Sequence, residues 1–216
     1  MTKIKICGIT NLPDARAAIQ AGADYLGFNF YPKSPRYIAP AACAEITSIV
    51  KRAHPHIKLV GVFVNAPVDE IIAILDACSL DLAQLHGDEP PEALAALGGK
   101  AFKALRISAQ SAYPLPHPLP QPALLIDAAV KGVYGGSGVT ADWNAAAEIA
   151  RRYSIFLAGG LTAENVSAAI RQVHPWGVDV ASGVESAPGV KDAAKMKAFV
   201  NAVKLAKYTA KRGANL

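Results

Sequence analysis

Residues 155–185 read IFLAGGLTAENVSAAIRQVHPWGVDVASGVE and contain two short apolar runs with a helical segment between them. The first run ends at Gly159 and Gly160, and the second ends at Ser182 and Gly183. Glycine lets the main chain approach a ligand because it carries no side chain. Free N–H groups at strand ends and at a helix N-terminus favour an anion. The stretch therefore predicts a phosphate site, and two ordinary connections between strands and helices are the alternative.

Strand-like runs of this kind recur along the chain and mostly alternate with helix-like segments. They lie at 3–7, 25–29, 59–64, 82–85, 102–107, 123–127, 155–157 and 178–181. Eight units in 216 residues leave roughly 27 residues for each, which suits compact βα repeats. The pattern predicts an α/β protein with a closed (β/α)8 TIM barrel, formed by one domain that spans residues 1–216. In such barrels the loops after strands 7 and 8 often bind phosphate.

Helix start signals support the repeat. N-cap residues or prolines precede most helical segments; they are Asn11, Pro40, Pro67, Pro90 or Pro91, Asp142 and Thr162. One connection differs, because residues 113–122 read YPLPHPLPQP and hold five prolines, which forbid a regular helix. We predict an irregular proline-rich crossover between strands 5 and 6.

Composition narrows the class of protein. No apolar run approaches the ~18 residues of a membrane span, and no signal peptide is evident, so we expect a cytoplasmic protein without membrane contact. The net charge of +5 arises from residues 191–212, which carry +6. We interpret this segment as the solvated face of a terminal helix and expect no nucleic-acid partner. The three cysteines lack CxxC spacing, which argues against a zinc site.

The carboxyl ends of barrel strands carry the chemistry in this fold. The first strand ends in KIKICG, and its two-residue alternation turns Lys5 and Cys7 toward the interior. Cys7 is a candidate base or nucleophile, or else a buried apolar filler. An unpaired ammonium inside the barrel would be costly. Because strand 8 adjoins strand 1 in a closed barrel, we predict a contact between Lys5 and Asp179.

Other strand ends add polar side chains. Arg36 follows strand 2, and its guanidinium can hold a carboxylate with two hydrogen bonds, unless it is simply solvated. His86 ends strand 4 and either lines the pocket or bonds nearby backbone groups. Asp127 ends strand 6, where desolvation would raise its pKa and let it act as an acid; capping the next turn is the alternative. A lid or a second anion-binding turn is predicted beyond it, at Gly136, Ser137 and Gly138.

Seven motifs, taken together and in chain order, resemble the phosphoribosylanthranilate isomerase family of the tryptophan pathway. They are KICGIT at 5–10, GFNFYPKSPRY at 27–37, QLHG at 84–87, LLID at 124–127, YGGSG at 134–138, LAGGLTAENV at 157–166 and VDVASGVES at 178–186. Each motif is weak alone, but seven in register over nearly the whole chain are specific. One departure is Ala141, which stands where the family commonly has an aromatic residue before Asp142 and Trp143.

The resemblance implies an Amadori rearrangement of N-(5′-phosphoribosyl)anthranilate that uses neither a metal nor another cofactor. It also implies roles for the residues that match the motifs. Asp127 would be the general acid that protonates the ribose ring oxygen, and Cys7 the general base that takes the proton from C2′. Arg36 would hold the anthranilate carboxylate, and the phosphate would bind the amides of Gly159, Gly160, Ser182 and Gly183. We expect a small sugar phosphate as the partner, and a monomer or a weak homodimer.

Three rival functions remain open. A histidine-pathway isomerase on the same barrel, or a bifunctional relative, would be expected to carry a carboxylate where this chain has Cys7. A ribulose-phosphate epimerase would be expected to have metal-binding His and Asp residues at several strand ends, where this chain offers His86. A non-catalytic phosphate-binding barrel would have no reason to place both a thiol and a carboxyl at facing strand ends.

Overall fold

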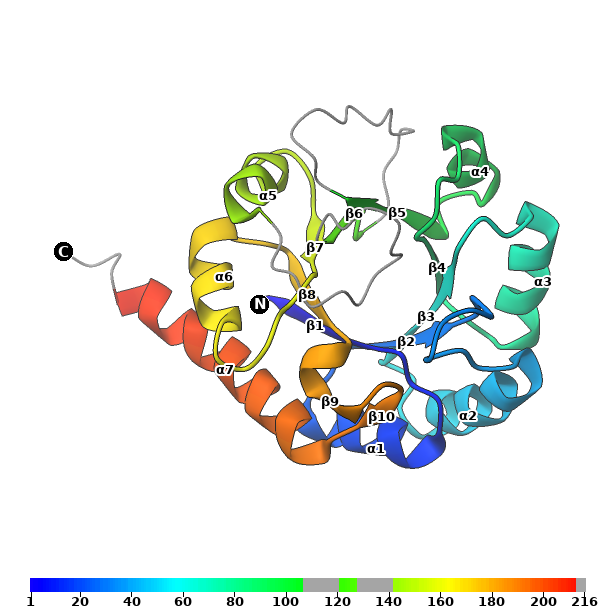
Figure 1. The fold of residues 1–216 in the computed structure, drawn as a ribbon, viewed down its shortest axis with the longest axis horizontal. Helices are drawn as coiled ribbons and strands as arrows, with labels where there is room; N and C mark the ends of the chain where they lie inside the picture. The colour runs from blue at the N-terminus through cyan, green and yellow to red at the C-terminus, as the bar shows by residue number, and fades with distance from the viewer. Residues whose placement is uncertain (107–120, 128–141, 213–216) are drawn as a thin grey trace.

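Eight parallel strands form a closed barrel in chain order, which confirms the predicted (β/α)8 architecture (Figure 1). The computed structural model describes residues 1–106, 121–127 and 142–212. The strands are β1 (Lys3–Cys7), β2 (Tyr25–Asn29), β3 (Lys58–Phe63), β4 (Leu82–Leu85), β5 (Ala101–Arg106), β6 (Leu124–Asp127), β7 (Ile155–Leu157) and β8 (Gly177–Val180). The predicted boundaries agree with these to within one residue.

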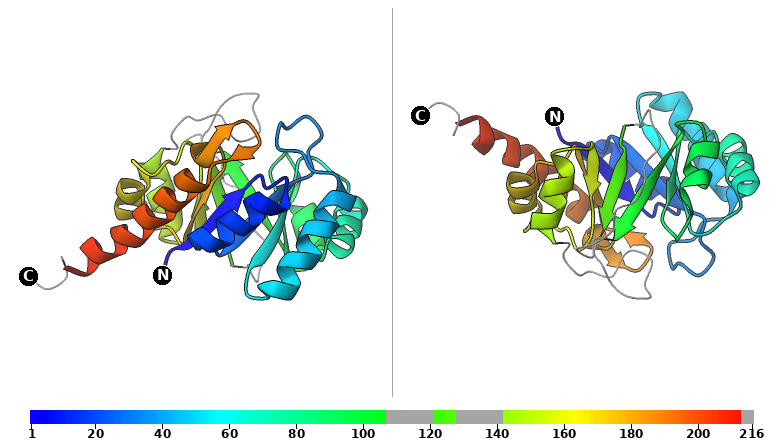
Figure 2. Two further views of the ribbon diagram at one scale, coloured as in Figure 1. Left: turned by 90° about the horizontal axis from the view of Figure 1, so that it is seen from below. Right: turned by 90° about the horizontal axis from the view of Figure 1, so that it is seen from above.

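Helices surround the barrel on its outer face (Figures 1 and 2). They are α1 (Leu12–Ala21), α2 (Pro40–Ala53), α3 (Val68–Ala77), α4 (Pro91–Ala96), α5 (Trp143–Ala150), α6 (Val166–Val173) and α7 (Ala193–Arg212). The side chains of Asn11 and Asp142 accept backbone N–H groups at the starts of α1 and α5, as N-caps do. None of the described helices is both long and apolar enough to cross a membrane.

The predicted cap of α6 was wrong. Thr162 lies before the helix, and Asn165 occupies the N-cap position. The side-chain oxygen of Asn165 accepts the Thr162 N–H at 2.9 Å, while its amide nitrogen donates to the carbonyl of Gly160 at 2.8 Å. Asn165 therefore folds the turn that leaves β7, and the helix starts one turn later than the sequence pattern indicated.

The strands alternate their side chains between two apolar layers. Ile4 and Ile6 of β1 belong to the larger cluster, which also contains side chains of the surrounding helices. A smaller cluster inside the barrel contains Tyr25 and Phe156, whose rings lie 5.3 Å apart edge to face. Gly177 makes room for this ring, because a Cβ there would lie 2.4 Å from an atom of Phe156. Aromatic packing therefore fills part of the barrel interior.

The closure between β1 and β8 brings Lys5 opposite Asp179. Lys5 Nζ lies 2.9 Å from Asp179 Oδ1, and both residues are buried, so the predicted contact is confirmed. Burial by itself would lower the pKa of the Lys5 ammonium, but the Asp179 carboxylate and the Cys7 side chain together leave that pKa above its ordinary value. The Asp179 carboxylate thus neutralises the buried Lys5 ammonium, whose burial without a partner would be costly.

A short 3-10 helix, η1 (Ser182–Val184), and a hairpin of β9 (Glu185–Ala187) and β10 (Val190–Lys191) follow β8. Figure 2 shows the hairpin and the loop after β2 extending from the same end of the barrel, opposite the N-terminus. Most of the predicted proline-rich crossover lies in residues 107–120, outside the described residues. The predicted lid at Gly136, Ser137 and Gly138 lies in residues 128–141, which are also outside them.

Candidate active site

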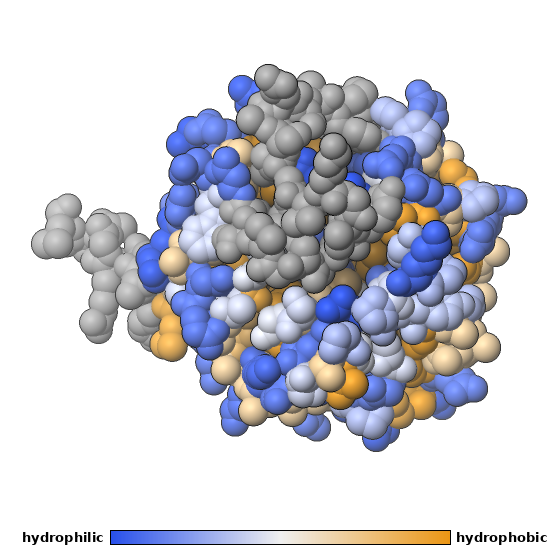
Figure 3. Space-filling model, viewed as in Figure 1, coloured by the Kyte–Doolittle hydropathy of each residue, from blue (hydrophilic) through white to orange (hydrophobic). Residues whose placement is uncertain are grey.

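A cavity opens at the carboxyl ends of the barrel strands. Cys7 from β1, His86 from the end of β4 and Asp127 from β6 line it. The other described residues that the sequence analysis singled out line it too, namely Arg36, Gly159, Gly160, Ser182 and Gly183. Figure 3 views the molecule from this end and shows hydrophilic and hydrophobic residues intermixed over its described surface. Residues more than 100 positions apart in sequence therefore share one cavity.

Cys7 turns its sulfur toward the barrel interior, beside Lys5. A Cβ on Gly27 of β2 would lie 2.8 Å from Cys7 Sγ and 3.1 Å from Lys5 Nζ, so glycine leaves the space that both groups occupy. Burial raises the pKa of the Cys7 thiol above its ordinary value, although the Lys5 ammonium acts in the opposite direction. The thiol is therefore neutral at neutral pH before substrate arrives.

Asp127 belongs to a buried chain of three polar side chains. His86 Nε2 lies 3.1 Å from Asp127 Oδ2, and His86 Nδ1 lies 2.7 Å from Gln84 Nε2. Because the Gln84 amide donates to Nδ1, the ring proton sits on Nε2 and is donated to the Asp127 carboxylate. His86 thus contacts the candidate acid directly. The sequence analysis missed Gln84, although its place two residues before His86 on one strand turns both to the same side.

Hydrogen bonds and an ion pair of Glu89 and Lys103 hold the loop that carries His86. The carboxylate of Glu89 accepts the N–H of Gly87 at 2.9 Å and the N–H of Asn65 at 2.8 Å. Lys103 of β5 donates to the Gly87 carbonyl at 2.7 Å and forms a buried ion pair with Glu89. These contacts hold the backbone just after His86 in place, and the position of the backbone in turn limits where the imidazole can lie.

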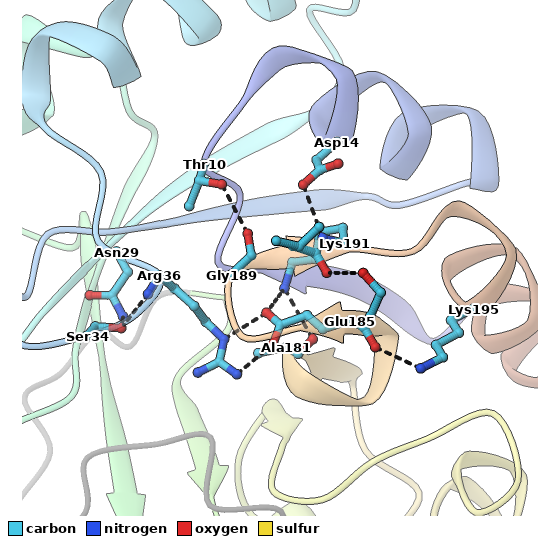
Figure 4. A network of polar contacts seen from close by, with 12 residues as sticks. Thr10, Asp14, Asn29, Ser34, Arg36, Ala181, Glu185, Gly189, Lys191 and Lys195 are labelled. Carbon is cyan, nitrogen blue, oxygen red and sulfur yellow. Dashed lines mark hydrogen bonds and ion pairs between the residues drawn. The ribbon is translucent and has the colours of Figure 1, made fainter.

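Arg36 forms a two-pronged ion pair that the sequence analysis did not predict (Figure 4). Its Nε lies 2.8 Å from Glu185 Oε1, and its Nη2 lies 2.7 Å from Glu185 Oε2. Lys191 Nζ donates to the same Oε1 at 2.7 Å. Lys191 is buried in β10, so the interpretation of the whole segment 191–212 as a solvated helix face was wrong at this residue. The only feature of the sequence that hinted at this ion pair was Glu185, an acidic residue just beyond the Ser182–Gly183 turn.

The network shifts the pKa values of all three groups. Hydrogen bonds to Glu185 raise the pKa of Arg36. Burial alone would raise the pKa of Glu185, but the hydrogen bonds from Arg36 and Lys191 hold it below the usual range. Burial lowers the pKa of Lys191 despite its ion pair with Glu185. At neutral pH the carboxylate is ionised, and two cations share it.

Two glycine turns, residues 159–160 and 182–183, form the remaining wall. Gly159 and Gly160 have φ angles of 86° and 63°, in the left-handed region that favours glycine. Gly183 packs against the other turn so closely that a Cβ would lie 2.0 Å from the Leu161 carbonyl oxygen. Within residues 1–106, 121–127 and 142–212, no hydrogen bond engages the backbone N–H of Gly159, Gly160, Ser182 or Gly183. Among the described residues, these four amides are therefore available to donate hydrogen bonds to an anion.

A family model and curated relatives agree on one family. The family model described as N-(5′phosphoribosyl)anthranilate (PRA) isomerase matches residues 4–202. An N-(5′-phosphoribosyl)anthranilate isomerase of Pelobacter propionicus is 48% identical over 204 residues, which cover 94% of this chain and 96% of that protein. The corresponding enzyme of Geotalea daltonii is 47% identical over 205 residues, covering 94% of this chain and 97% of that protein.

Solved structures show the same likeness. The phosphoribosyl anthranilate isomerase of Thermotoga maritima superimposes with a TM-score of 0.82 at 35% identity, covering 94% of this chain and 99% of that one. The Thermus thermophilus enzyme gives a TM-score of 0.82 at 36% identity, again covering 94% and 99%. A further isomerase structure, at 35% identity and a TM-score of 0.78 with the same coverage, holds reduced 1-(o-carboxyphenylamino)-1-deoxyribulose 5-phosphate.

Proposed function

The chain belongs to the N-(5′-phosphoribosyl)anthranilate isomerase family, and from that premise we propose which of its residues carry the reaction. It is an aldose–ketose isomerase of tryptophan biosynthesis. The substrate N-(5′-phosphoribosyl)anthranilate is converted into 1-(2-carboxyphenylamino)-1-deoxyribulose 5-phosphate by an Amadori rearrangement. The observation that carries the residue assignment is that one cavity is lined by the Cys7 thiol, the Asp127 carboxyl and both glycine turns.

Binding uses the two charged ends of the substrate. The phosphate is held by the amides of Gly159, Gly160, Ser182 and Gly183, which no described protein group engages. The anthranilate carboxylate is held by Arg36, whose side chain lines the cavity. Fixing both ends orients the ribose between Cys7 and Asp127, and such orientation contributes substantially to rate.

The first chemical step opens the sugar ring. Asp127 in its protonated form donates a proton to the ribose ring oxygen, the bond from C1′ to that oxygen breaks, and an iminium forms with the anthranilate nitrogen. His86 donates a hydrogen bond to the Asp127 carboxylate at 3.1 Å. This contact orients the carboxyl and stabilises the anion that remains after proton transfer.

The second step moves a proton from carbon. Cys7 as thiolate removes the proton from C2′, and the electron pair of that bond neutralises the iminium to give an enolamine, which then tautomerises to the ketone. The iminium favours the thiolate because it places a positive charge near a thiol whose pKa burial has raised. Lys5, which acts on the same thiol, adds to this effect.

Several properties of the whole protein belong to the same proposal. The chain acts as one domain over residues 1–216, and its partner is this sugar phosphate rather than a nucleic acid. Phosphorylated sugars do not cross membranes unaided, so a cytoplasmic location suits the substrate. The protein is a monomer or a weak homodimer, because the exposed large hydrophobic side chains of the described part lie mainly on separate segments, at Met1, Tyr37, Ile72, Val190 and Leu205.

The test is incubation of the purified protein with N-(5′-phosphoribosyl)anthranilate while anthranilate-type fluorescence is followed. We expect the wild type to turn over the substrate. We expect kcat to fall about 10²–10⁴-fold in Cys7→Ser and in Asp127→Asn. Both variants are expected to retain substrate binding, measured by fluorescence titration. A wild-type protein that binds the substrate without converting it would identify a non-catalytic phosphate-binding barrel instead.

A further inference from the structure

Glu185 lies behind Arg36 rather than in the substrate space. Arg36 lines the cavity, whereas neither Glu185 nor Lys191 is among its lining residues. The side chain of Glu185 is 4% exposed, and both of its oxygens receive hydrogen bonds from Arg36. Nη1 of Arg36 makes no hydrogen bond to any described side chain or backbone group. Nε and Nη2 on one edge of the guanidinium are therefore bound to Glu185, and the edge that carries Nη1 can bind another carboxylate.

The Glu185 bridge, defined as Arg36, Glu185 and Lys191, connects two loops that bind different parts of the substrate. Arg36 lies in the loop after β2, whereas Glu185 begins β9 directly after the Ser182–Gly183 turn and η1. Lys191 also donates to the carbonyl of Ala181 at 3.1 Å (Figure 4). The bridge thus sets the position of the carboxylate-binding arginine relative to the phosphate-binding amides.

The charges of the bridge leave one cation in excess. Arg36 and Lys191 each contribute +1 and Glu185 contributes −1, so the three residues sum to +1. A lone Arg36–Glu185 pair would be neutral and would attract a carboxylate less strongly. The buried Lys191 ammonium therefore restores the positive charge that Glu185 would otherwise cancel.

We propose that Glu185 is a positioning residue for substrate recognition. It fixes the Arg36 guanidinium in the orientation that receives the anthranilate carboxylate, and Lys191 keeps the net charge of the Glu185 bridge positive. This inference rests on the proposed function. It is separable from that function, because the hydrogen bonds of the Glu185 side chain go to Arg36 and Lys191 and to none of the described acid, base or phosphate-binding amides. It concerns the strength and geometry of carboxylate binding, and hence KM.

Glu185→Gln separates positioning from simple charge, because the two predict opposite results. The substitution raises the net charge of the bridge from +1 to +2, which by charge alone would tighten binding of an anionic substrate. Loss of the two-pronged grip frees the guanidinium, which weakens binding. We expect KM to rise roughly 10-fold or more while kcat changes by less than about 3-fold. An unchanged or lowered KM would overturn the proposal.

The double variant Glu185→Gln with Lys191→Gln keeps the wild-type net charge without the grip. We expect its KM to stay raised; a return to the wild-type KM would show that charge alone matters and would overturn the proposal. Glu185→Asp retains the charge but shortens the side chain by one methylene, so it should also raise KM. This conservative variant keeps the test valid should Glu185→Gln fail to fold.

Two inhibitors complete the experiment with the same variants. N-Ethylanthranilate carries the carboxylate without the phosphate, and inorganic phosphate represents the other anionic group alone. Glu185→Gln should weaken inhibition by N-ethylanthranilate by the same factor as KM and leave inhibition by phosphate within about 3-fold. Equal weakening of both would indicate a merely structural role and would overturn the proposal.

The matched control is Glu148→Gln, which makes the same chemical change in the exposed ion pair between Glu148 and Arg151 on α5. It should leave KM, kcat and both inhibition constants unchanged. Absence of turnover by the wild type would refute the proposed function. Wild-type turnover with an unaffected Glu185→Gln would refute only the positioning role.

Discussion

The imidazole of His86 lies against the carboxylate of Asp127, with 3.1 Å between Nε2 and Oδ2. Both side chains are buried at the cavity wall, and the Gln84 amide fixes the other ring nitrogen at 2.7 Å. A carboxyl that must give up and recover a proton in each turnover is therefore oriented by a side chain from a different strand. This relationship and three others lead to measurable expectations.

Replacement of His86 should slow chemistry more than it weakens binding. In His86→Leu the Asp127 carboxylate loses a hydrogen bond from the imidazole, and such charge-assisted bonds are worth about 1.5–3 kcal/mol. We expect kcat to fall about 10- to 100-fold with KM changed by less than about 3-fold. Steady-state kinetics test this, and a large rise in KM at constant kcat would contradict the assigned contact.

The reactivity of Cys7 should depend steeply on pH. Burial raises the pKa of this thiol above 9.0, so at lower pH the thiolate is a minor species. The rate of alkylation by iodoacetamide should then rise with pH and should still be rising at pH 9.0. Mass spectrometry of the Cys7 peptide, without substrate, provides the measurement. A rate that levels off near neutral pH would mean that the Lys5 ammonium dominates over burial.

Gly183 should not tolerate a side chain. A Cβ at this position would lie 2.0 Å from the Leu161 carbonyl oxygen, which belongs to the backbone of the other glycine turn and cannot move alone. Gly183→Ala should therefore push the two turns apart and weaken inhibition by inorganic phosphate by about 10-fold or more. Gly98→Ala, whose added Cβ would meet no atom within 4 Å, is the matched control that should leave phosphate inhibition nearly unchanged. Equal inhibition constants for Gly183→Ala and the wild type would contradict the assigned phosphate site.

The buried pair of Lys5 and Asp179 should dominate stability at the barrel closure. Asp179→Asn leaves a buried ammonium without a counter-charge, which costs about 3–5 kcal/mol of unfolding free energy. The double variant Lys5→Met with Asp179→Leu should recover most of that loss, because matched apolar side chains replace a buried ion pair well. Urea denaturation measures both. A single variant within about 1 kcal/mol of the wild type would contradict this expectation.

The pH dependence of that stability follows from the direction of the Lys5 shift. Its folded-state pKa lies above the ordinary 10.5, so the pair contributes fully below pH 10.5. The contribution is lost as pH rises through the folded-state pKa. The difference in unfolding free energy between the wild type and Asp179→Asn, measured by urea denaturation, should therefore shrink as pH rises above 10.5.

Much of the architecture was predictable because it depends on local patterns. Two-residue alternation on β1 turned Lys5 and Cys7 inward, and the rule that strand 8 adjoins strand 1 gave the contact with Asp179. Side-chain caps at Asn11 and Asp142 were read directly from residue type. Thr162 failed as a cap because Asn165, a competing residue of the same kind, folds the turn instead.

The sequence by itself determined the barrel, the order of its strands and the ends at which reactive side chains gather, since hydrophobic periodicity and turn residues act over short distances along the chain. Only the tertiary structure decided the partners of those side chains. Arg36 and Glu185 are 149 positions apart and meet because the loop after β2 and the hairpin after β8 leave the same end of the barrel. No local pattern encodes that pairing, because ion pairs form according to distance in space.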